Sequence, residues 1–577
     1  MTRPGGAVHV VTTKREYKGK VYVAHLLRRS YREDGKVKNE TVGNLSHLPE
    51  HVVEIVRRAL KGETFPSLPD AFQITSPLPH GHIQAVRSAM HRLGFEELLG
   101  PRPSRERDLV VGMVAARIVA PRTKLATTRW WQSNTLAEDL GIQDAREGEL
   151  YAAMDWLLAR QEQIEHKLVR RHLSEDSLVL YDLSSSYFEG EKCPLARFGH
   201  NRDGKKGKLQ VNYGLVTDQR GCPVAISVFE GNTSDSLTLL PQVRKLKEGY
   251  GLKRFVAVGD RGMISAKATQ DLQAEGLDWI TALKSSQIRE LVESGHLQLG
   301  LFDERNLFEV FHPDYPGERL VACRNPELAK LRAKKRESLL DATRGEFGKV
   351  KRMVERGQLR TPAEIGLRAG KVADKYKVAK HFALEIDQGH FDFHVLKEQV
   401  EAEARLDGIY VIRSSVPKER MSLDDTVRSY KLLSTVERAF RSLKTVDLKV
   451  RPIHHRLEDR VRGHIFLCML AYYVEWHLRE AWRPLLFADE DQQAKKTRDP
   501  VAPAQRSEAA ELKAATHQLP DGSPAHSFQT LLDLLGAITR NTCRTRDGGD
   551  EAPSFKIVSE PNTTQRRALS LVEAITP

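Results

Sequence analysis

Alternating apolar and polar residues predict a small β-rich module at the start of the chain. The segments VHVVTT, KVYVAHLL and VKNETVGNLS lie between residues 8 and 48 and have the two-residue period of half-buried strands. EDGK, which precedes the last of them, is typical of a hairpin turn. A helix is predicted from Pro49 to Lys61, with basic residues in its last turn, where cations are favourable. Residues 1–75 are therefore predicted to form a basic β+helix module.

The pattern then becomes helical. A linker is indicated by four prolines, Pro66, Pro69, Pro77 and Pro79. Beyond it, apolar residues recur with the helical period, as in IQAVRSAMHRLGFEELL, and predict a helical domain over residues 76–175. In this domain PRTKLATTRWWQ combines Arg and Lys with Trp130 and Trp131. That mixture suits a surface for a polyanion, although paired tryptophans are more often anchors of a core.

From residue 176 the pattern is that of strands joined by hairpins and helices. LVLY, at residues 178–181, is long enough for one buried strand, and LQVNYGLVTD and PVAISVFEGN follow as a hairpin. These three strands are therefore expected to be antiparallel neighbours. A helix over residues 236–250 leads to a strand over residues 254–258, and a crossover of this kind returns a parallel partner. One more helix and strand complete residues 176–284.

Residues 285–405 interrupt this pattern. NLFEVFHPDYPGERLVACR has the pattern of strands and precedes a charged helical segment from Pro326 to Arg356. That segment is consistent with a solvated hairpin or with an arm that contacts a polyanion. The core pattern resumes over residues 406–484, with a strand in LDGIYVIRSS and an apolar helix in VRGHIFLCMLAYYVEWHL. A C-terminal tail follows over residues 485–577, with a polar linker first, then a short helix over residues 527–540 and a strand in SFKIVS.

Composition describes a folded protein with a basic surface. A chain of 577 residues exceeds what one core usually holds, so roughly two to four domains are expected. Hydrophobic residues make up 40% of the chain and charged residues 29%, which excludes a disordered protein. Lys and Arg number 90 against 77 acidic residues, a net charge of +13. This excess suits a polyanionic partner, and nucleic acid is the commonest one.

The cysteines and the apolar runs indicate the compartment. The five cysteines are scattered without a metal-knuckle spacing, which predicts free thiols, a reducing compartment and no structural zinc. The N-terminus MTRPGGAVHVV lacks the apolar stretch of a signal peptide. The longest apolar run, Ile465 to Val474, is about half as long as a bilayer-spanning helix. We therefore expect a cytoplasmic protein with no membrane partner.

Two aspartates stand where predicted central strands end. Asp182 follows LVLY, and Asp260 ends RFVAVGD. Open α/β sheets bind their ligands at the carboxyl ends of strands, and convergent carboxylates repel unless a hard cation such as Mg²⁺ lies between them. Two such ions about 3.5–4 Å apart would clamp the attacking and leaving oxygens of a phosphoryl displacement. Alternatively, Asp182 caps a turn through the serines that follow it.

A third carboxylate is available on a predicted helix, SYKLLSTVERAFRSLK. Tyr430, Glu437 and Lys444 recur every seven residues, so they share one helix face. Arg441 lies four residues after Glu437, and a helical glutamate among cations is commonly a salt-bridge partner. Because it follows two strand-end aspartates, Glu437 is also a candidate for the third ligand of a metal.

The ordered set of YDLSSSYFEG, FEGNTSD, VGDRGMIS, LDGIYVIRSS and YKLLSTVERAFRSLK resembles the insertion-sequence DDE transposases over roughly residues 80–480. The resemblance is strongest to the insertion-sequence-four superfamily branch with a Tyr-Arg-Glu-Lys signature and a long insertion before the glutamate. One position departs, because Leu433 stands where the signature has arginine. The predicted strand order is that of a ribonuclease-H-like fold. We therefore expect an α/β protein whose ribonuclease-H-like catalytic core is interrupted by a mixed β/helical insertion and preceded by the two modules above.

The resemblance implies a role for each candidate residue. Asp182, Asp260 and Glu437 would be the catalytic carboxylates and the ligands of two Mg²⁺ or Mn²⁺ ions. Metal-bound water would cut a phosphodiester at the end of the element, and the freed 3′ hydroxyl would then attack target DNA. DNA would be contacted by Tyr430, Arg438, Arg441, Lys444, Arg202, Lys205 and Lys206. Similar transposases act as dimers that bridge two ends, which implies a nucleoid-associated homodimer here.

Two other classes of protein share these features. A ribonuclease-H-like nuclease would use the same carboxylates to cleave DNA without joining it. A non-catalytic DNA-binding protein derived from a transposase would keep the fold and the basic surface. The intact set of three carboxylates argues against the non-catalytic protein, whereas the nuclease shares the set and remains an alternative.

Overall fold

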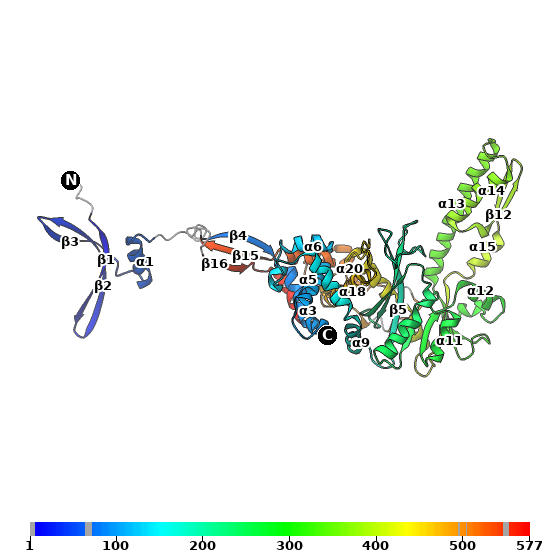
Figure 1. Cartoon of the computed structure of the whole chain (residues 1–577), viewed down its shortest axis with the longest axis horizontal. Helices are drawn as coiled ribbons and strands as arrows, with labels where there is room; N and C mark the ends of the chain where they lie inside the picture. Colours follow the sequence, from blue (N-terminus) through cyan, green and yellow to red (C-terminus); the bar gives the residue numbers. More distant parts are fainter. Residues whose placement is uncertain (1–5, 64–71, 494–496, 503–504, 546–552) are drawn as a thin grey trace. The chain divides into compact units, whose positions relative to one another are not determined.

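The computed structural model describes residues 6–63, 72–493, 497–502, 505–545 and 553–577 (Figure 1). The chain divides into two compact units. One consists of Met1–Pro77 with Arg540–Ser559, and the other of Leu78–Thr539 with Glu560–Pro577. None of the helices within the described ranges is long and apolar enough to cross a membrane.

The N-terminal module is an antiparallel sheet followed by a helix. Its elements are β1 (Val8–Tyr17), β2 (Lys20–Glu33), β3 (Lys36–Asn44) and α1 (Glu50–Leu60). The EDGK turn is confirmed, because Asp34 and Gly35, with φ of 50° and 74°, form the reversal between β2 and β3. A second small sheet has the order β16–β15–β4, with β16 (Ser554–Val558), β15 (Thr539–Thr545) and β4 (Phe72–Pro79).

The predicted proline linker is partly wrong. Pro77 and Pro79 belong to strand β4 instead. Strand β4 is the last in the order of its sheet, and an edge position tolerates residues that lack an N–H donor. Pro66 and Pro69 lie outside the described residues.

Residues 81–172 are helical, as the pattern predicted. The helices are α3 (Gly81–Arg92), α4 (Phe95–Leu99), α5 (Arg105–Val119), α6 (Lys124–Trp131), α7 (Leu136–Leu140), α8 (Glu147–Leu158) and α9 (Gln161–His172). Ser104 and Thr123 begin α5 and α6 as side-chain caps that accept backbone N–H groups. Trp131 is 2% exposed and lies in the hydrophobic core, so this tryptophan is a core anchor.

An eight-stranded mixed sheet forms the centre of the larger unit. In spatial order its strands are β10 (Leu307–Val310), β11 (Arg319–Arg324), β14 (Ile409–Ser414), β9 (Asp278–Ala282), β8 (Val256–Val258), β5 (Leu178–Tyr187), β6 (Gln210–Thr217) and β7 (Pro223–Glu230). Strands β5, β6 and β7 are antiparallel neighbours, and β8 is parallel to both β5 and β9. The strand directions predicted for residues 176–284 are confirmed.

Helices cover this sheet and connect its strands. The crossover from β7 to β8 runs through η1 (Asp235–Leu237), α10 (Leu239–Arg244) and the π-helical turn η2 (Lys245–Gly249), and α11 (Ala266–Ala274) joins β8 to β9. Helix α18 (Glu458–Ala481) is buried along most of its length and packs on α5, α8 and β7. It therefore joins the helical domain to the sheet, which explains its nearly uniform apolar character.

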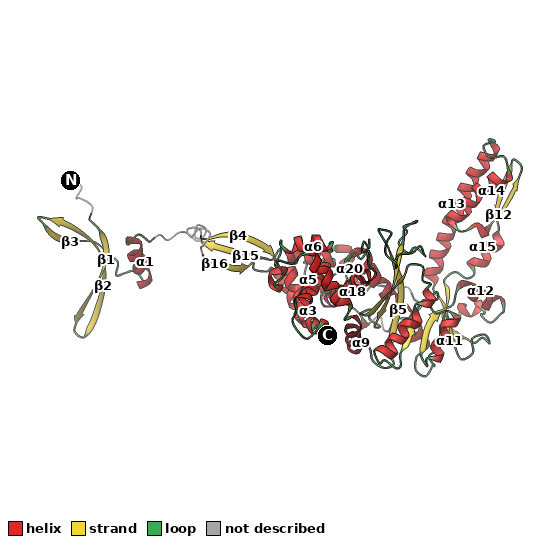
Figure 2. Cartoon of the chain, viewed as in Figure 1, coloured by secondary structure: helices red, strands yellow, loops and turns green. Residues whose placement is uncertain are grey.

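The predicted insertion contains two strands of the central sheet. Strands β10 and β11 lie beyond β14, and β11 pairs antiparallel with β14 along its whole length. The rest of the insertion consists of four helices, a hairpin and two short turns. The helices are α12 (Ser285–Glu293), α13 (Pro326–Glu355), α14 (Pro362–Tyr376) and α15 (Lys397–Ala404). The hairpin is β12 (Phe382–Asp387) and β13 (His390–Val395), and the turns are η3 (Leu299–Asp303) and η4 (Ala379–His381). Figure 2 shows α13 and α14 side by side with this hairpin. The phenylalanines Phe347, Phe382, Phe391 and Phe393 form a separate core between them.

The C-terminal part of the chain returns to the helical domain. Its elements are η6 (Arg483–Leu485), α20 (Glu508–Thr516), α21 (Phe528–Gly536) and α22 (Thr563–Glu573). Helices α21 and α22 both pack on α3. Trp482 is fully buried, and its indole N–H donates a 2.9 Å hydrogen bond to the carbonyl of Ala568. The C-terminal tail predicted from residue 485 therefore includes packed helices.

We predict that Gly214→Ala destabilises the central sheet. A Cβ on Gly214 would lie 2.1 Å from the hydroxyl of Tyr181, a ring that is 2% exposed. Overpacking of this kind lowers the free energy of unfolding by roughly 1–3 kcal/mol. Differential scanning calorimetry measures the change. The control Gly370→Ala, on α14 with nothing within 4 Å, should leave the melting temperature equal or higher.

A second prediction concerns acid stability. Burial, and to a smaller extent the charge of His80, lower the pKa of His82 from 6.5 to about 4. Below pH 6.5 the unfolded chain therefore takes up a proton that the folded chain does not. The free energy of unfolding should fall between pH 6.5 and 4 by up to about 3 kcal/mol from this residue. Urea titrations at several pH values should show that the free energy of unfolding falls less with acid in His82→Gln than in His390→Gln, a control at an exposed position.

Candidate active site

The register of β5 and β8 determines where the two candidate aspartates lie. The parallel pairing ends where Leu180 is opposite Val258, and Asp182 and Asp260 each follow two residues later. The sequence pattern predicted Asp182 at the end of its strand, and this is wrong. Strand β5 continues to Tyr187 because β6 pairs with it throughout. Only the pairing with β8 stops, so both carboxylates lie past the same end of that parallel pair.

Asp182 lies within electrostatic reach of the other two candidate carboxylates. Burial is the main cause that raises the pKa of Asp182 to about 7, and the charges of Asp260 and Glu437 raise it further. The backbone N–H of Leu183, which donates a 2.8 Å hydrogen bond to Oδ1, and the cation of Arg202 act in the opposite direction. The structure therefore brings the three acids to one place. Asp182 is half-buried, whereas Asp260 and Glu437 are exposed.

Glu437 comes from a broken helix rather than from the continuous helix that the seven-residue spacing predicted. The elements are α16 (Leu423–Lys431), α17 (Leu433–Arg441) and the π-helical turn η5 (Ser442–Val446). The interruption falls at Leu432, whose carbonyl accepts a hydrogen bond from the N–H of Thr435 at 2.8 Å. Helix α17 packs on β5, which places Glu437 beside the strand that carries Asp182.

Tyr430 contacts one of the aspartates directly. Its hydroxyl donates a hydrogen bond to Oδ1 of Asp260 at 3.2 Å. Burial and the charge of Asp260 raise the pKa of Tyr430, so the phenol remains protonated and can donate. The adjacent Arg261 is exposed, has no ion pair among the described residues, and lowers this pKa through its charge.

Lys444 is buried instead of facing solvent. Its ammonium lies 2.5 Å from Oδ1 of Asp203 and donates to the hydroxyl of Ser184 at 3.2 Å. Arg451 forms a second ion pair with Asp203, and the backbone N–H of Tyr187 donates a 2.9 Å hydrogen bond to Oδ2 of Asp203. The side chain of Asp203 is 2% exposed, so these contacts hold the basic loop of residues 199–208 against β5.

Of the other predicted DNA-binding residues, Arg438, Arg441, Lys205 and Lys206 are exposed and Arg202 is half-buried. Neither Arg438 nor Arg441 has an ion pair among the described residues. Arg202 is paired with Asp235 at 2.5 Å. Lys205 lies 6.0 Å from the ring centroid of Tyr187, and Lys206 is exposed.

Leu433, which stands at the signature arginine position, is 9% exposed and packs in the hydrophobic core. It therefore presents no group to a phosphate. The guanidinium groups nearest to it in sequence that face solvent belong to Arg438 and Arg441.

The donor atoms of the three acids suit a hard divalent cation. Carboxylate oxygens are the ligands that Mg²⁺ and Mn²⁺ prefer, and the charges of Asp260 and Glu437 add to burial in raising the pKa of Asp182. Within the described ranges, one group of three His, Cys, Asp or Glu residues has donor atoms that all lie within 4.8 Å of one another. That group is His172, Cys222 and His477, not the three acids. The three carboxylates are therefore spaced more widely than the ligands of a single ion.

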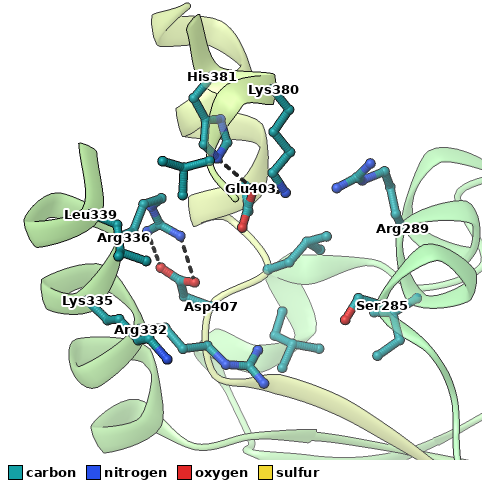
Figure 3. Close-up of a pocket in the computed structure, with 14 residues that line it drawn as sticks. Ser285, Arg289, Arg332, Lys335, Arg336, Leu339, Lys380, His381, Glu403 and Asp407 are labelled. Carbon is teal, nitrogen blue, oxygen red and sulfur yellow. Dashed lines mark hydrogen bonds and ion pairs between the residues drawn. The ribbon is translucent and has the colours of Figure 1, made fainter. Parts of the chain in front are cut away.

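A basic cavity lies where the insertion meets the central sheet. It has a volume of about 340 Å³, and α12 and α13 contribute to its walls (Figure 3). Arg336 is paired with Asp407, and Lys380 with Glu403. Three cations of its lining have no ion pair among the described residues: Arg289, Arg332 and Lys335.

Comparison with known proteins identifies the family. The model of the transposase DDE domain matches residues 174–474, more than half of the chain, and the chain belongs to this family. DDE transposases are enzymes that cleave DNA and transfer its strands by phosphoryl transfer, and they generally use divalent metal ions. The model of the N-terminal domain of IS1634 family transposases matches residues 10–67. The chain is therefore an insertion-sequence transposase whose partner is DNA.

One solved structure with limited similarity is a piggyBac transposase synaptic complex with hairpin DNA. It is 9% identical in sequence, with a TM-score of 0.33, and the match covers 79% of this chain and 76% of that one. No curated protein matches the chain.

The sequence pattern missed three residues around the acids. Asp203 is an acid in an otherwise basic loop, a sign that it is paired inside the protein. Arg451 has no such sign, because it lies far from the loop in sequence. Arg261 directly follows Asp260 in VGDRG, so its position next to a candidate acid was a signal in the sequence.

We predict that Lys444 stabilises the fold. Lys444→Met removes one of two cations from a buried carboxylate, which should lower the free energy of unfolding by roughly 3 kcal/mol. Arg441→Met, at an exposed position of the same segment, should change it by less than about 0.5 kcal/mol. Chemical denaturation of both variants measures the difference. Equal stability of the two variants would show that Asp203 does not depend on the lysine.

Proposed function

We propose that this transposase uses Asp182, Asp260 and Glu437 as its catalytic carboxylates and that residues 176–284 with 406–484 form a ribonuclease-H-like core. The observation that carries the proposal is the convergence of three segments, because Asp182 and Asp260 both lie past the same end of the β5–β8 pair and α17, which carries Glu437, packs on β5. The order β7–β6–β5–β8–β9, with three antiparallel strands followed by two parallel ones, supports the fold assignment.

The same three residues would hold the metal, for which we propose two Mg²⁺ or Mn²⁺ ions. When bound, the ions supply a nucleophilic water and stabilise charge on the oxygens of the phosphodiester. The residues fit such ions, because all three offer carboxylate oxygens and the charges of Asp260 and Glu437 both act on Asp182. Tyr430 would orient Asp260 through its hydrogen bond.

The exposed cations would position DNA. Arg438 and Arg441 lie on the same helix as Glu437 and have no acid to neutralise them within the described part of the chain, so they are available to phosphates. Lys205 and Lys206, on the basic loop, and Arg202 would extend this contact along the backbone. Orientation of the phosphodiester, rather than covalent chemistry, is what these side chains contribute.

The basic cavity beside α13 supports the interpretation of the insertion as a DNA-contacting arm. Arg289, Arg332 and Lys335, which have no ion pair within the described ranges, match a phosphate group better than a neutral ligand. We also propose that the active complex is a homodimer that bridges two ends. Mass photometry with end DNA should then give complexes of two chains.

We predict that Asp182→Asn, Asp260→Asn and Glu437→Gln each reduce cleavage of labelled element ends by at least about 1,000-fold, because each removes a charge needed for metal-assisted phosphoryl transfer. The controls Asp271→Asn and Glu419→Gln remove acids outside the site and should leave cleavage unchanged. The melting temperature of each variant, measured in parallel, separates lost chemistry from lost folding.

A target plasmid in the same reaction tests the joining step. Wild-type protein should give labelled ends covalently joined to the plasmid. Cleaved ends without any joined product would instead identify a nuclease. Full cleavage by the three carboxylate variants would reject the assignment of these residues.

A further inference from the structure

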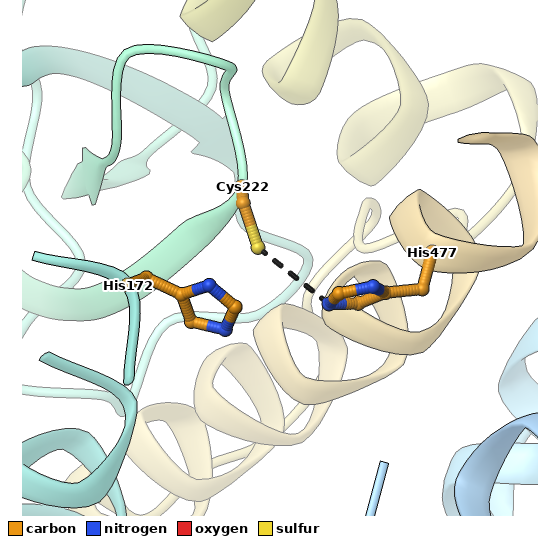
Figure 4. A group of neighbouring side chains, drawn as sticks. All are labelled: His172, Cys222 and His477. Carbon is orange, nitrogen blue, oxygen red and sulfur yellow. Dashed lines mark hydrogen bonds between the residues drawn. The ribbon is translucent and has the colours of Figure 1, made fainter. Parts of the chain in front are cut away.

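A second group of metal-ligating side chains lies apart from the three acids. His172 is the last residue of α9, Cys222 lies in the turn between β6 and β7, and His477 belongs to α18 (Figure 4). One donor atom from each lies within 4.8 Å of the other two, and Sγ of Cys222 is 3.9 Å from Nε2 of His477. Three segments that are remote in sequence thus place three donor atoms around one point.

The chemistry of these donors differs from that of the candidate active site. Two imidazole nitrogens and one sulfur are the ligands that Zn²⁺ takes in proteins, whereas Mg²⁺ prefers oxygen. Cys222 and His477 are buried, at 0% and 7% exposure, and His172 is half-buried. His172 is therefore the most solvent-accessible of the three ligands.

Surrounding groups orient these ligands in the way that metal sites require. The Nε2 atom of His172 lies 3.1 Å from the hydroxyl of Tyr473, which also accepts a hydrogen bond from Arg171 at 3.0 Å. The backbone N–H of Cys222 donates to Oδ1 of the buried Asp218 at 2.9 Å. The contact of His172 is of the kind that orients a metal-ligating imidazole, and the bond to Asp218 fixes the backbone of the turn that carries Cys222.

The nearest positive charge is neutralised. Arg220 has one guanidinium nitrogen 3.4 Å from Nδ1 of His172, which by itself would disfavour a cation. Its Nε atom, however, lies 2.8 Å from Oδ2 of Asp218, and its guanidinium lies 5.1 Å from the ring centroid of Trp476. Loss of the thiol proton of Cys222 to solvent on binding would leave a site with one net positive charge.

We propose that His172, Cys222 and His477 bind one Zn²⁺ ion, with a water molecule as the fourth ligand. The ion fastens the β6–β7 turn to α9 and α18. The turn has a further contact, because Gly221, with φ of +86°, approaches Thr435 of α17 so closely that a Cβ would lie 2.9 Å from its Cβ. The ion would therefore also fix the surface against which the helix of Glu437 packs.

The test measures the metal directly. Full-length, tag-free protein is dialysed against buffer with Zn²⁺, then against metal-free buffer, and its zinc content is measured by mass spectrometry. We expect about one zinc per chain in the wild type and at most about a tenth of that in Cys222→Ser and His477→Gln. Cys193→Ser, which changes another buried free cysteine, should keep the zinc. Asp182→Asn should keep it as well, which excludes the acids as its ligands.

A second measurement detects the thiolate ligand in the wild-type protein itself. Co²⁺ added to the metal-free wild type should give a thiolate-to-cobalt absorption band, and Cys193→Ser should give the same band. A wild-type protein without this band, and with no more zinc than Cys222→Ser, would overturn the proposal and leave the three residues as ordinary core packing. No DNA is present in either measurement, so the outcome is independent of the catalytic assignment.

Discussion

The parallel pairing of β5 with β8 is the constraint on which the candidate site depends. Its register sets Leu180 opposite Val258 and so brings Asp182 and Asp260 past one end of the pair. A shift of one residue would turn every side chain of a strand to the other face. The buried residues on both sides of β5 resist such a shift, because one face would then lose its apolar contacts. Helix α17 packs on this same strand and adds the third acid.

Acids gathered at one place destabilise the folded chain, and the structure offsets this only in part. The N–H of Leu183 and the guanidinium of Arg202 favour the charged form of Asp182, but burial and the other two carboxylates outweigh them. The neighbouring acid Asp203 forms ion pairs with two cations and accepts a hydrogen bond from a backbone N–H. One buried acid is thus fully compensated for stability, while the adjacent set keeps an excess of negative charge, the condition that a divalent cation relieves.

Local patterns in the sequence were sufficient for the order and directions of the strands of residues 176–284 and for the EDGK turn, whereas they left open whether the tryptophans at 130 and 131 face a core or a partner. They failed where distant segments decide. Strands β10 and β11 join the central sheet because β14, about ninety residues later, pairs with β11. Lys444 faces inward because Asp203 is there to pair with it. The break between α16 and α17 at Leu432 could not be predicted from the sequence either, since the helical periodicity continues through it.

The position of β14 in the central sheet has a consequence for synthesis of the protein. This strand lies between β9 and β11, yet it is made after both of them and after the whole α13–α14 arm. A nascent polypeptide that has left the ribosome only as far as β11 cannot complete its sheet. The two halves of the sheet are therefore joined only after the arm has been made, and a chain that ends before β14 has β9 and β11 without the strand that lies between them.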